Sequence, residues 1–400
     1  MNETRATLPR ILIVWNWIPC FHLGAGILMR RLFAGYPPDR LWALTSSQSK
    51  RDSAPFDPLP RPEHQLSVPE IQIHRRLVHR LALLLNYMLI PWTVWRGAKL
   101  VREENINAIF TVPWDQYTVA AYFIHRLTGR PLYMYAMDDP AGARRFAGLR
   151  PVVYALLMPR VARGCKRLWG VSDGMCEYFQ QTYTVKCLPL LPLLELEEFK
   201  EKNVRKSDRA DGSFQVIYTG SIYSAQLDAV RRLVHVVDQE PSNNNGAPAS
   251  MLMTLYTSVS SAALEKMGLS GKNVRRSEVR HEDVARVLAE ADVVFLPLSF
   301  EPGMRHIVET SFPSKIAEYL AAGVPILVHA PAYSAAARYC RDQECALVVD
   351  EPDEAALRDG LMRLRDDAAL RRALSAKGLE VAAKNHDARR IAPAFLEQMC

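Results

Sequence analysis

The sequence lacks the motifs of several common enzyme and metal-binding classes. Its 7 cysteines, spread over 400 residues, include no C-x-x-C pair, so neither a zinc site nor a disulfide framework is indicated. No Walker loop, G-x-S-x-G elbow or H-E-x-x-H segment is present, which argues against P-loop, α/β-hydrolase and zinc-protease chemistry. The first residues, MNETRATLPRILIVW, show no signal-peptide pattern. We therefore expect a cytoplasmic protein with reduced thiols and no metal.

A complete dinucleotide fingerprint is also missing. Gly24 and Gly26 follow the first apolar run, but no third glycine completes the pattern. No acidic residue stands out about 20 positions later either, so an NAD enzyme is disfavoured. The N–H groups of Gly24 and Gly26 can still bind the pyrophosphate of a nucleotide, although a simple turn explains them equally well. Zinc-finger, RNA-binding and basic-zipper patterns are absent as well, so no nucleic-acid partner is expected.

The charge of the chain is unevenly distributed. Residues 1–200 contain 25 Lys and Arg against 16 Asp and Glu, whereas the remainder contains 25 against 27. A basic first half indicates an anionic partner such as an anionic membrane, and a solvated basic surface is the nearly equal alternative. Two apolar segments flanked by cations, 80–96 and 149–167, strengthen the membrane interpretation. The first is too short to span a bilayer and is predicted to be mainly a buried helix, bent or ended near Pro91.

Short apolar runs alternate with helical segments along the whole chain, which predicts βαβ units and parallel sheets. At 400 residues, two domains are expected. A charged linker near 193–212 favours two Rossmann-like domains over one large sheet. The predicted strands are 11–15, 41–45, 71–74, 108–112, 131–136 and 167–172 in the first domain, and 214–220, 250–257, 273–279, 291–298, 325–330 and 346–350 in the second.

Residues 313–323, PSKIAEYLAAG, carry the strongest functional pattern. They predict a helix that starts at a proline and ends at a glycine, just after the strand ADVVFLPL. Ligands of open α/β sheets bind where such strands lead into helices. Ser314, Lys315 and the free N–H groups there suit a diphosphate. Glu318 lies on the same helical face and can accept hydrogen bonds from ribose hydroxyls, although an exposed salt bridge is the alternative.

The segment PSKIAEYLAAGVPIL (313–327) resembles the donor-nucleotide motif of GT-B glycosyltransferases, in particular the family-4-like bacterial enzymes, glycosyl transferases group 1. FQVIYTGSI (214–222) and LWGVSDGMCEYF (168–179) are similar to other segments of that family. The resemblance implies two Rossmann-like domains facing across a cleft. Residues 1–195 would bind the acceptor, residues 210–385 the nucleotide sugar, and a C-terminal helix at 386–400 would pack back on the first domain. The implied donor-binding residues in the second domain are Gly220, Ser221, Arg305, Ser314, Lys315 and Glu318.

Two positions depart from the family pattern. Ser221 follows Gly220, and Gln226 occupies the usual place of a lysine. The charge of the donor would therefore rest more heavily on Lys315, helped by Arg305. The first glutamate of the family's two-glutamate motif is replaced by Thr310, which leaves the donor sugar and the stereochemistry open, with a retaining reaction as the expectation.

The resemblance implies a hexosyltransferase that moves a sugar from a nucleotide-diphosphate sugar to an acceptor hydroxyl, without a metal or other cofactor. Its acceptor would be a glycan or lipid-linked molecule in polysaccharide or glycolipid synthesis, with peripheral contact at the inner face of the plasma membrane. Asp138 and Asp139, in AMDDPAG, are candidate bases at a strand end, and His22 is a further candidate. A nucleotide-sugar epimerase and a non-catalytic nucleotide-sugar-binding partner remain the alternatives.

Overall fold

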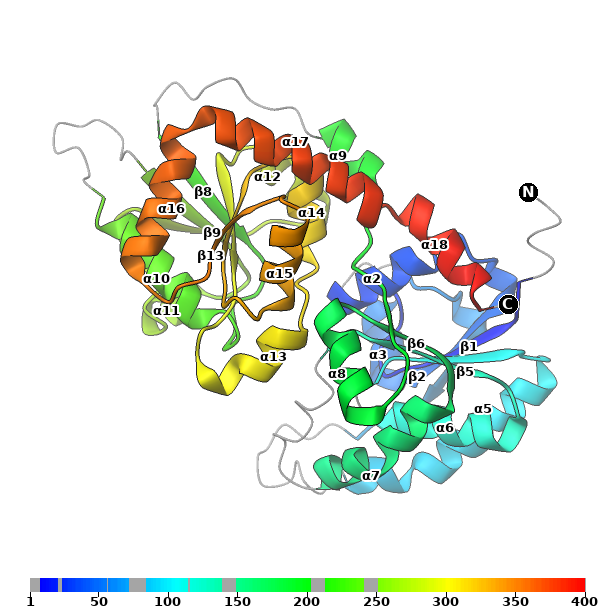
Figure 1. Cartoon of the computed structure of the whole chain (residues 1–400). Coiled ribbons are helices and arrows are strands. Elements are labelled where there is room, and N and C mark those ends of the chain that lie inside the picture. The colour runs from blue at the N-terminus through cyan, green and yellow to red at the C-terminus, as the bar shows by residue number, and fades with distance from the viewer. Residues whose placement is uncertain are drawn as a thin grey trace. The chain divides into compact units, whose positions relative to one another are not determined.

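A computed structural model describes residues 8–20, 24–55, 57–71, 84–113, 116–138, 149–202, 213–240 and 251–399. These residues form two α/β units, each built on one parallel sheet with helices against it (Figure 1). Unit 1 comprises Met1–Leu191 and Ala388–Cys400, and unit 2 comprises Pro192–Asp387. The predicted fold class of two Rossmann-like α/β sheets is confirmed.

The sheet of unit 1 has seven strands in the order β3-β2-β1-β4-β5-β6-β7, and the paired neighbours are parallel. Its central strands are apolar on both faces because helices cover both, which is why the sequence shows continuous rather than alternating runs. The strands are β1 (Ile11–Val14), β2 (Leu41–Ser46), β3 (Gln65–Val68), β4 (Ala108–Thr111), β5 (Leu132–Ala136), β6 (Cys165–Gly170) and β7 (Leu188–Pro189).

The strand order places the helices of unit 1 on two faces of the sheet. The chain steps from β1 to β2 and β3 in one direction, and then returns to β4, β5 and β6 in the other. Because parallel crossovers are right-handed, the connections of the two runs cover opposite faces. Helices α5, α6 and α7 therefore share one face. The helices are α2 (Gly24–Leu32), α3 (Ser47–Ser53), α5 (Ile90–Glu103), α6 (Gln116–Thr128), α7 (Leu149–Gly164), α8 (Asp173–Tyr183) and α18 (Ala388–Glu397), with short 3-10 turns at Pro38–Arg40 and Pro62–His64.

The third strand lies earlier than predicted. Residues 65–68 pair with β2, whereas the predicted strand at 71–74 is wrong at Ile71 and otherwise lies outside the described residues. The side chain of Asn86 bonds both backbone groups of Ile71, accepting from its N–H (2.9 Å) and donating to its C=O (3.0 Å). Those groups are then not available to a neighbouring strand, so the chain has left the sheet at this residue.

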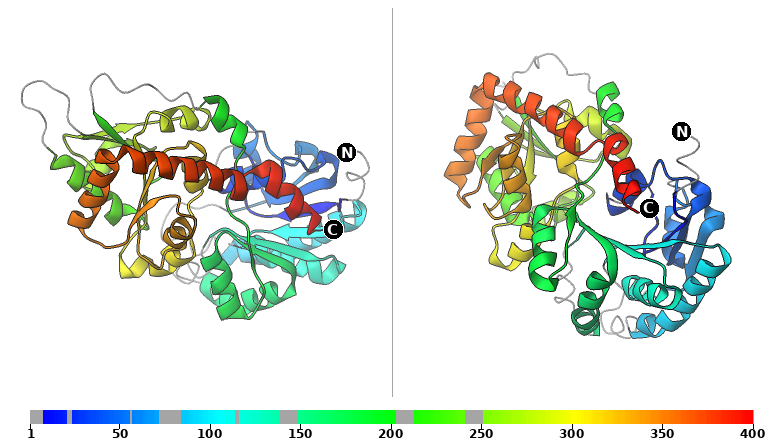
Figure 2. Two further views of the ribbon diagram at one scale, coloured as in Figure 1. Left: turned by 45° about the horizontal axis from the view of Figure 1, so that its top comes forward. Right: turned by 45° about the vertical axis from the view of Figure 1, so that its right-hand side comes forward.

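The C-terminal segment belongs to unit 1. Phe395 of α18 packs against Phe33 (5.8 Å between ring centroids) and Trp169 (4.7 Å). The hydroxyl of Tyr133 donates to the C=O of Met399 (2.9 Å). Both views of Figure 2 show α18 beside α2, in agreement with the contacts between these two helices. The aromatic core of unit 1 is thus completed by residues from the far end of the chain.

The sheet of unit 2 has six strands in the order β10-β9-β8-β11-β12-β13, again with parallel neighbours. Its strands are β8 (Phe214–Thr219), β9 (Met251–Tyr256), β10 (Val274–Ser277), β11 (Val293–Pro297), β12 (Ile326–His329) and β13 (Leu347–Val349). Its helices are α9 (Leu196–Lys202), α10 (Leu227–Asp238), α11 (Ser261–Lys266), α12 (Val284–Leu288), α13 (Arg305–Thr310), α14 (Lys315–Ala321), α15 (Ala335–Asp342), α16 (Glu354–Asp366) and α17 (Ala368–Asn385), with 3-10 turns at His281–Asp283 and Pro302–Met304.

Unit 2 begins earlier than the predicted boundary at residue 210. Helix α9, which the sequence placed in the linker region, contacts α12 and α14 of unit 2. His386 ties the two ends of this unit together, because its Nδ1 lies 2.7 Å from the C=O of Pro192 and its own C=O accepts from the N–H of Leu194 (2.9 Å). Residues 192–202 are therefore part of a folded unit and not a free connection.

Candidate nucleotide-binding site

The carboxyl end of β8 and the start of α14 meet at Gly220 and Lys315. Gly220 has a φ of +109° and is exposed, and a Cβ placed on it would lie 3.1 Å from Lys315 Nζ and 3.5 Å from its Cε. Glycine is the residue that tolerates this φ, and it also leaves room for the ammonium. The predicted pair is therefore brought together at the ligand-binding edge of an open α/β sheet.

The ammonium of Lys315 faces a phenol. Its Nζ donates a hydrogen bond to the hydroxyl oxygen of Tyr218 (2.8 Å) and lies 4.0 Å from the centroid of that ring. Burial against these groups lowers the pKa of Lys315 to about 7, and the nearby carboxylate of Glu318 opposes the shift. An anion placed at Nζ would favour the charged form, so this lysine is suited to bind a phosphate.

Two tyrosines fix the geometry around Lys315. The hydroxyl of Tyr319 accepts hydrogen bonds from the N–H (3.0 Å) and the Oγ1 (3.2 Å) of Thr219, which joins α14 to the end of β8. The hydroxyl of Tyr218 donates its proton to the C=O of Ser221 (2.6 Å) or to Oε1 of Gln226 (3.2 Å). Burial raises the pKa of both tyrosines, so both stay neutral. Neither tyrosine was among the predicted site residues.

Gln226 explains one departure from the family pattern. Its side chain is buried, and its amide oxygen lies within hydrogen-bonding distance of Tyr218. At this position a lysine would place a second ammonium beside Lys315, whereas glutamine supplies an uncharged acceptor. Ser221 is exposed next to Gly220, and its C=O is the one that Tyr218 contacts.

Helix α14 begins two residues later than its proline suggested. Pro313 precedes the helix, and Ser314 occupies the N-cap position without a capping hydrogen bond from its side chain. Ser314 is exposed and Glu318 is half-buried, one turn along from Lys315. The helix ends as predicted, because Gly323 has a φ of +62° and donates to the C=O of Leu320 (3.1 Å).

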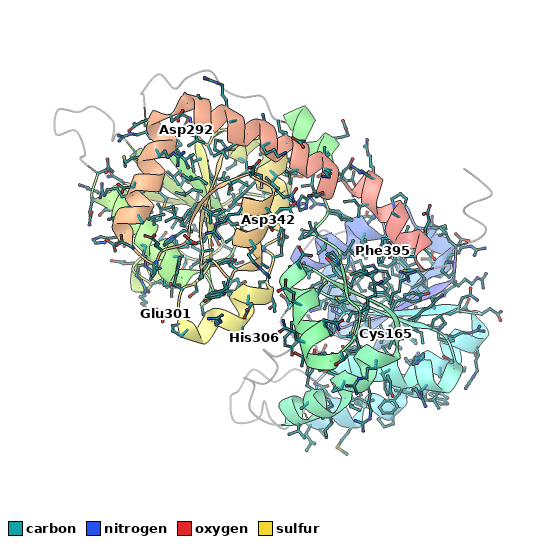
Figure 3. All side chains as sticks on the ribbon, viewed as in Figure 1. Cys165, Asp292, Glu301, His306, Asp342 and Phe395 are labelled. Carbon is teal, nitrogen blue, oxygen red and sulfur yellow. The ribbon has the colours of Figure 1, made fainter. Side chains whose placement is uncertain are left out.

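Arg305 lies on α13, in the segment that follows β11. Its guanidinium carbon is 4.3 Å from the ring centroid of Tyr333, and its Nε is 3.8 Å from Glu309 Oε2. Figure 3 shows Glu301 and His306 of this segment at the carboxyl end of the strands of unit 2, opposite Asp292, which precedes β11. Arg305 thus belongs to the same edge as Gly220, while its described contacts are with Tyr333 and Glu309 and not with Lys315.

A half-buried polar cluster lies at the same carboxyl end of the sheet, and the sequence did not predict that its members come together. Asp228 Oδ2 accepts from the N–H of Phe300 (2.9 Å) and from Arg232 (3.1 Å), and Phe300 packs on His329 at 4.6 Å. Burial lowers the pKa of His329 to about 4, so the ring is neutral, and its Nδ1 lies 3.2 Å from the C=O of Val349. Its Nε2 has no hydrogen-bond partner among the described residues.

The structure describes only three of the predicted site residues in unit 1, Gly24, Gly26 and Asp138. Gly24 begins α2 with open space at its Cβ position, whereas a Cβ on Gly26 would meet the C=O of Cys20 at 3.2 Å. Close packing against this backbone is therefore enough to explain why a glycine occupies position 26. Asp138 is exposed just beyond β5, and His22 and Asp139 lie outside the described residues. Within the described part of the chain, no three His, Cys, Asp or Glu side chains gather as a metal site, and no helix is long and apolar enough to cross a membrane.

Comparison with known proteins gives a family match for the second unit and a fold match for the whole chain. Residues 213–367, most of unit 2, match the family described as Glycosyl transferases group 1. No curated protein matches the chain by sequence. Among solved structures, sucrose-phosphate synthase from Thermosynechococcus elongatus is similar at 15% identity and a TM-score of 0.70, covering 97% of this chain and 98% of that one.

Two further solved structures share the fold over nearly the whole chain. HepE of Anabaena, in complex with UDP and glucose, is 13% identical with a TM-score of 0.67, covering 98% and 99% of the two chains. The α,α-trehalose 6-phosphate synthase of Burkholderia multivorans is 11% identical with a TM-score of 0.68, covering 98% and 96%. The resemblance drawn from the sequence is confirmed. The protein has the GT-B fold, and residues 213–367 of its second unit match the family described as Glycosyl transferases group 1.

Proposed function

We propose that the protein transfers a hexosyl group from a nucleoside-diphosphate sugar to an acceptor hydroxyl. The observation that carries this proposal is the contact between Gly220 and Lys315, within the segment that matches the glycosyltransferase family. A lysine with a lowered pKa, held against an exposed backbone turn, offers one ammonium and an open approach to a diphosphate.

Each residue of this site has a proposed role. Lys315 binds the diphosphate, and Gly220 lets the donor come close to the backbone. Glu318 accepts hydrogen bonds from the ribose hydroxyls, while Ser221 and Ser314 are exposed donors beside the diphosphate. Arg305 reaches the sugar or its phosphate from α13. HepE of Anabaena was solved with UDP-glucose, which makes a uridine nucleotide the first donor to test on this chain.

The transfer step exchanges two bonds at the anomeric carbon. The bond from this carbon to the diphosphate oxygen breaks, a bond to the acceptor oxygen forms, and the nucleoside diphosphate leaves. In a retaining reaction, the leaving phosphate oxygen takes the acceptor proton. In an inverting reaction, a carboxylate base such as Asp138 or Asp139 takes it. We propose the retaining route, with Lys315 in place of a metal ion as the charge that stabilises the leaving group.

The acceptor is proposed to bind unit 1 and to be a glycan or a lipid-linked molecule, as in polysaccharide or glycolipid synthesis at the inner face of the plasma membrane. The net positive charge of residues 1–200 supports a membrane-associated acceptor.

Calorimetric titration with UDP, GDP, CMP and NAD tests the proposed site. We expect tight binding of one nucleoside diphosphate by the wild type, loss of that binding in Glu318→Ala, and no loss in the control Glu265→Ala, whose glutamate is exposed on α11. Binding of NAD, or of none of the four, contradicts the proposal. Release of the nucleoside diphosphate only when acceptor is present then separates a transferase from an epimerase, which would consume donor alone.

A further inference from the structure

One face of unit 1 exposes large apolar side chains in a regular stripe. Leu84, Met88, Trp92 and Trp95 are 42%, 68%, 37% and 60% exposed. Their spacing of four, four and three residues places them on one side of the helical segment that runs into α5. The buried side of α5 carries Thr93, Val94, Gly97, Ala98 and Val101 instead. The segment around Pro91 is therefore not a buried helix, as the sequence suggested, and its proline lies in the first turn of α5.

The two neighbouring helices show the same arrangement. Phe123 and Leu127 of α6 are 39% and 60% exposed, and Val152 and Leu156 of α7 are 57% and 59% exposed. Helices α5 and α6, and α6 and α7, contact each other and cover the same face of the sheet (Figure 1). Among the described residues, eight of the eleven large exposed apolar side chains lie on these helices and the turn before α5. We call these eight residues the apolar face.

Cations accompany the apolar face. The guanidinium of Arg96 lies 5.1 Å from the ring centroid of Trp92, and the ammonium of Lys99 lies 5.9 Å from that of Trp95. Further along each helix, Arg102, Arg126, Arg160 and Arg163 add positive charge. The sequences of α6 and α7 contain no acidic residue, and Glu103 at the end of α5 pairs with Lys99 (3.5 Å). Apolar and positively charged groups are thus mixed, with almost no negative charge among them.

We propose that the apolar face docks on an anionic lipid surface. Tryptophan rings settle at the boundary between headgroups and acyl chains, and the cations beside them can pair with lipid phosphates while their stems stay along apolar surface. A protein partner is less suited to this face, because the cores of protein interfaces are depleted of charge, whereas both tryptophan rings here lie beside a cation. This inference deepens the membrane association of the proposed function, on which it rests, by naming the surface of unit 1 that meets the lipid. It does not depend on Lys315 or any residue of the donor site.

Sedimentation of the full chain with lipid vesicles tests the proposal. We expect binding to phosphatidylcholine vesicles that contain phosphatidylglycerol, weak binding to phosphatidylcholine alone, and a decrease in binding as salt is added. The doubly substituted Trp92→Ser, Trp95→Ser should lower the partition coefficient by about tenfold or more. The doubly substituted Arg96→Glu, Lys99→Glu should abolish the preference for anionic vesicles.

Matched controls separate a surface effect from misfolding. Leu379→Ser removes an apolar side chain that is 45% exposed in unit 2, and Arg280→Glu reverses an exposed cation there. Both controls should bind vesicles like the wild type. As a second measurement, brominated lipids should quench tryptophan fluorescence of the wild type, which needs no variant to fold.

Three outcomes overturn the proposal. The first is failure of the wild type to bind anionic vesicles at low salt. The second is binding that the tryptophan and charge variants leave unchanged. The third is a dimer, measured by light scattering, that the tryptophan variant dissociates, because the apolar face would then be an interface between copies of this chain. The first outcome would also remove the support for a membrane-associated acceptor. None of the three bears on nucleotide binding, so the donor site is tested separately.

Discussion

Lys315 should make donor binding depend on pH in a measurable way. Its pKa is about 7 in the unliganded protein, so at pH 8 only about a tenth of the molecules carry the ammonium. A diphosphate at Nζ stabilises the charged form and raises this pKa. Binding at pH 8 should therefore take up about 0.9 proton, and binding at pH 6 only about 0.1. The affinity should fall by up to about tenfold for each pH unit above 7, until the pKa of the complex is reached.

Calorimetry in buffers of different ionisation enthalpy measures this uptake. The ligand should be a sugar conjugate of whichever nucleoside diphosphate binds in the first titration, and not the free nucleoside diphosphate, because a terminal phosphate titrates near pH 6 and would release protons of its own. Lys315→Met should lose about 1.5–3 kcal/mol of binding free energy at pH 6, the usual worth of a hydrogen bond to a charged group. Lys315→Arg stays charged throughout this range, so its affinity should vary little between pH 6 and 9.

Lys266→Met is the matched control, since this lysine is exposed on α11 of the same unit. It should bind the donor with the proton uptake of the wild type. Two results would refute the reasoning. One is tight binding at pH 8 without proton uptake, which would mean that the diphosphate does not lie against Nζ. The other is uptake that persists in Lys315→Met, which would assign the proton to another group.

Three further predictions concern the packing around this site and the stability of unit 2. Gly220→Ala should weaken donor binding and cost about 1–3 kcal/mol of stability, because alanine is strained at a φ of +109° and its Cβ approaches Lys315. Calorimetry measures the binding and urea unfolding measures the stability. The control Gly303→Ala should change neither quantity, because a Cβ added at Gly303 would have no atom within 4 Å. Tyr319→Phe leaves the buried N–H of Thr219 without its acceptor and should lower the free energy of unfolding by about 1–3 kcal/mol, an effect that exposed Tyr223→Phe should not reproduce. Both ring nitrogens of His386 are hydrogen-bonded, and burial lowers its pKa to about 4. The unfolded chain therefore binds this proton more readily than the folded protein does. Acidification should thus lower the free energy of unfolding by about 2 kcal/mol between pH 7 and pH 5, and by about 3 kcal/mol by pH 4. Unfolding curves of His386→Asn should show a shallower loss on acidification, and equal slopes in the two proteins would contradict the assignment.

The sheets could be predicted from the sequence because most of their strands are buried on both faces. Eleven of the twelve predicted strands overlap strands of the structure, and nine of these eleven have a neighbouring strand on both sides. The two edge strands of unit 1 were not predicted. Strand β3, at one edge of its sheet, has the sequence QLSV with two half-buried residues, and β7 at the other edge is two residues long. An edge strand pairs on one side only and needs less apolar surface, so the more apolar residues 71–74 were chosen instead.

The sequence indicated individual residues of the candidate site but not which of them lie against one another. Lys315 and Glu318 share a helical face, which spacing reveals, and Gly220 follows a recognisable strand. The contact between Gly220 and Lys315 joins residues that are far apart in the chain, so no local pattern could predict it. Tyr218 was missed for a related reason. Every residue of β8 is buried, so alternation along the strand could not indicate which side chain ends at the ammonium.

The orientation of α5 shows what a sequence pattern leaves undecided and what packing then settles. Both sides of this helix are apolar, one with tryptophans and the other with small residues, so helical periodicity alone fits either side against the sheet. Gly97 decides the orientation, because a Cβ there would lie 2.4 Å from Ile124 Cδ1 of α6 and 3.0 Å from Leu44 Cδ1 of β2. Only the side with small residues can approach α6 and the sheet so closely. The tryptophans must then face outward, and their exposure follows from the close packing of α5 and not from any weakness in the core of unit 1.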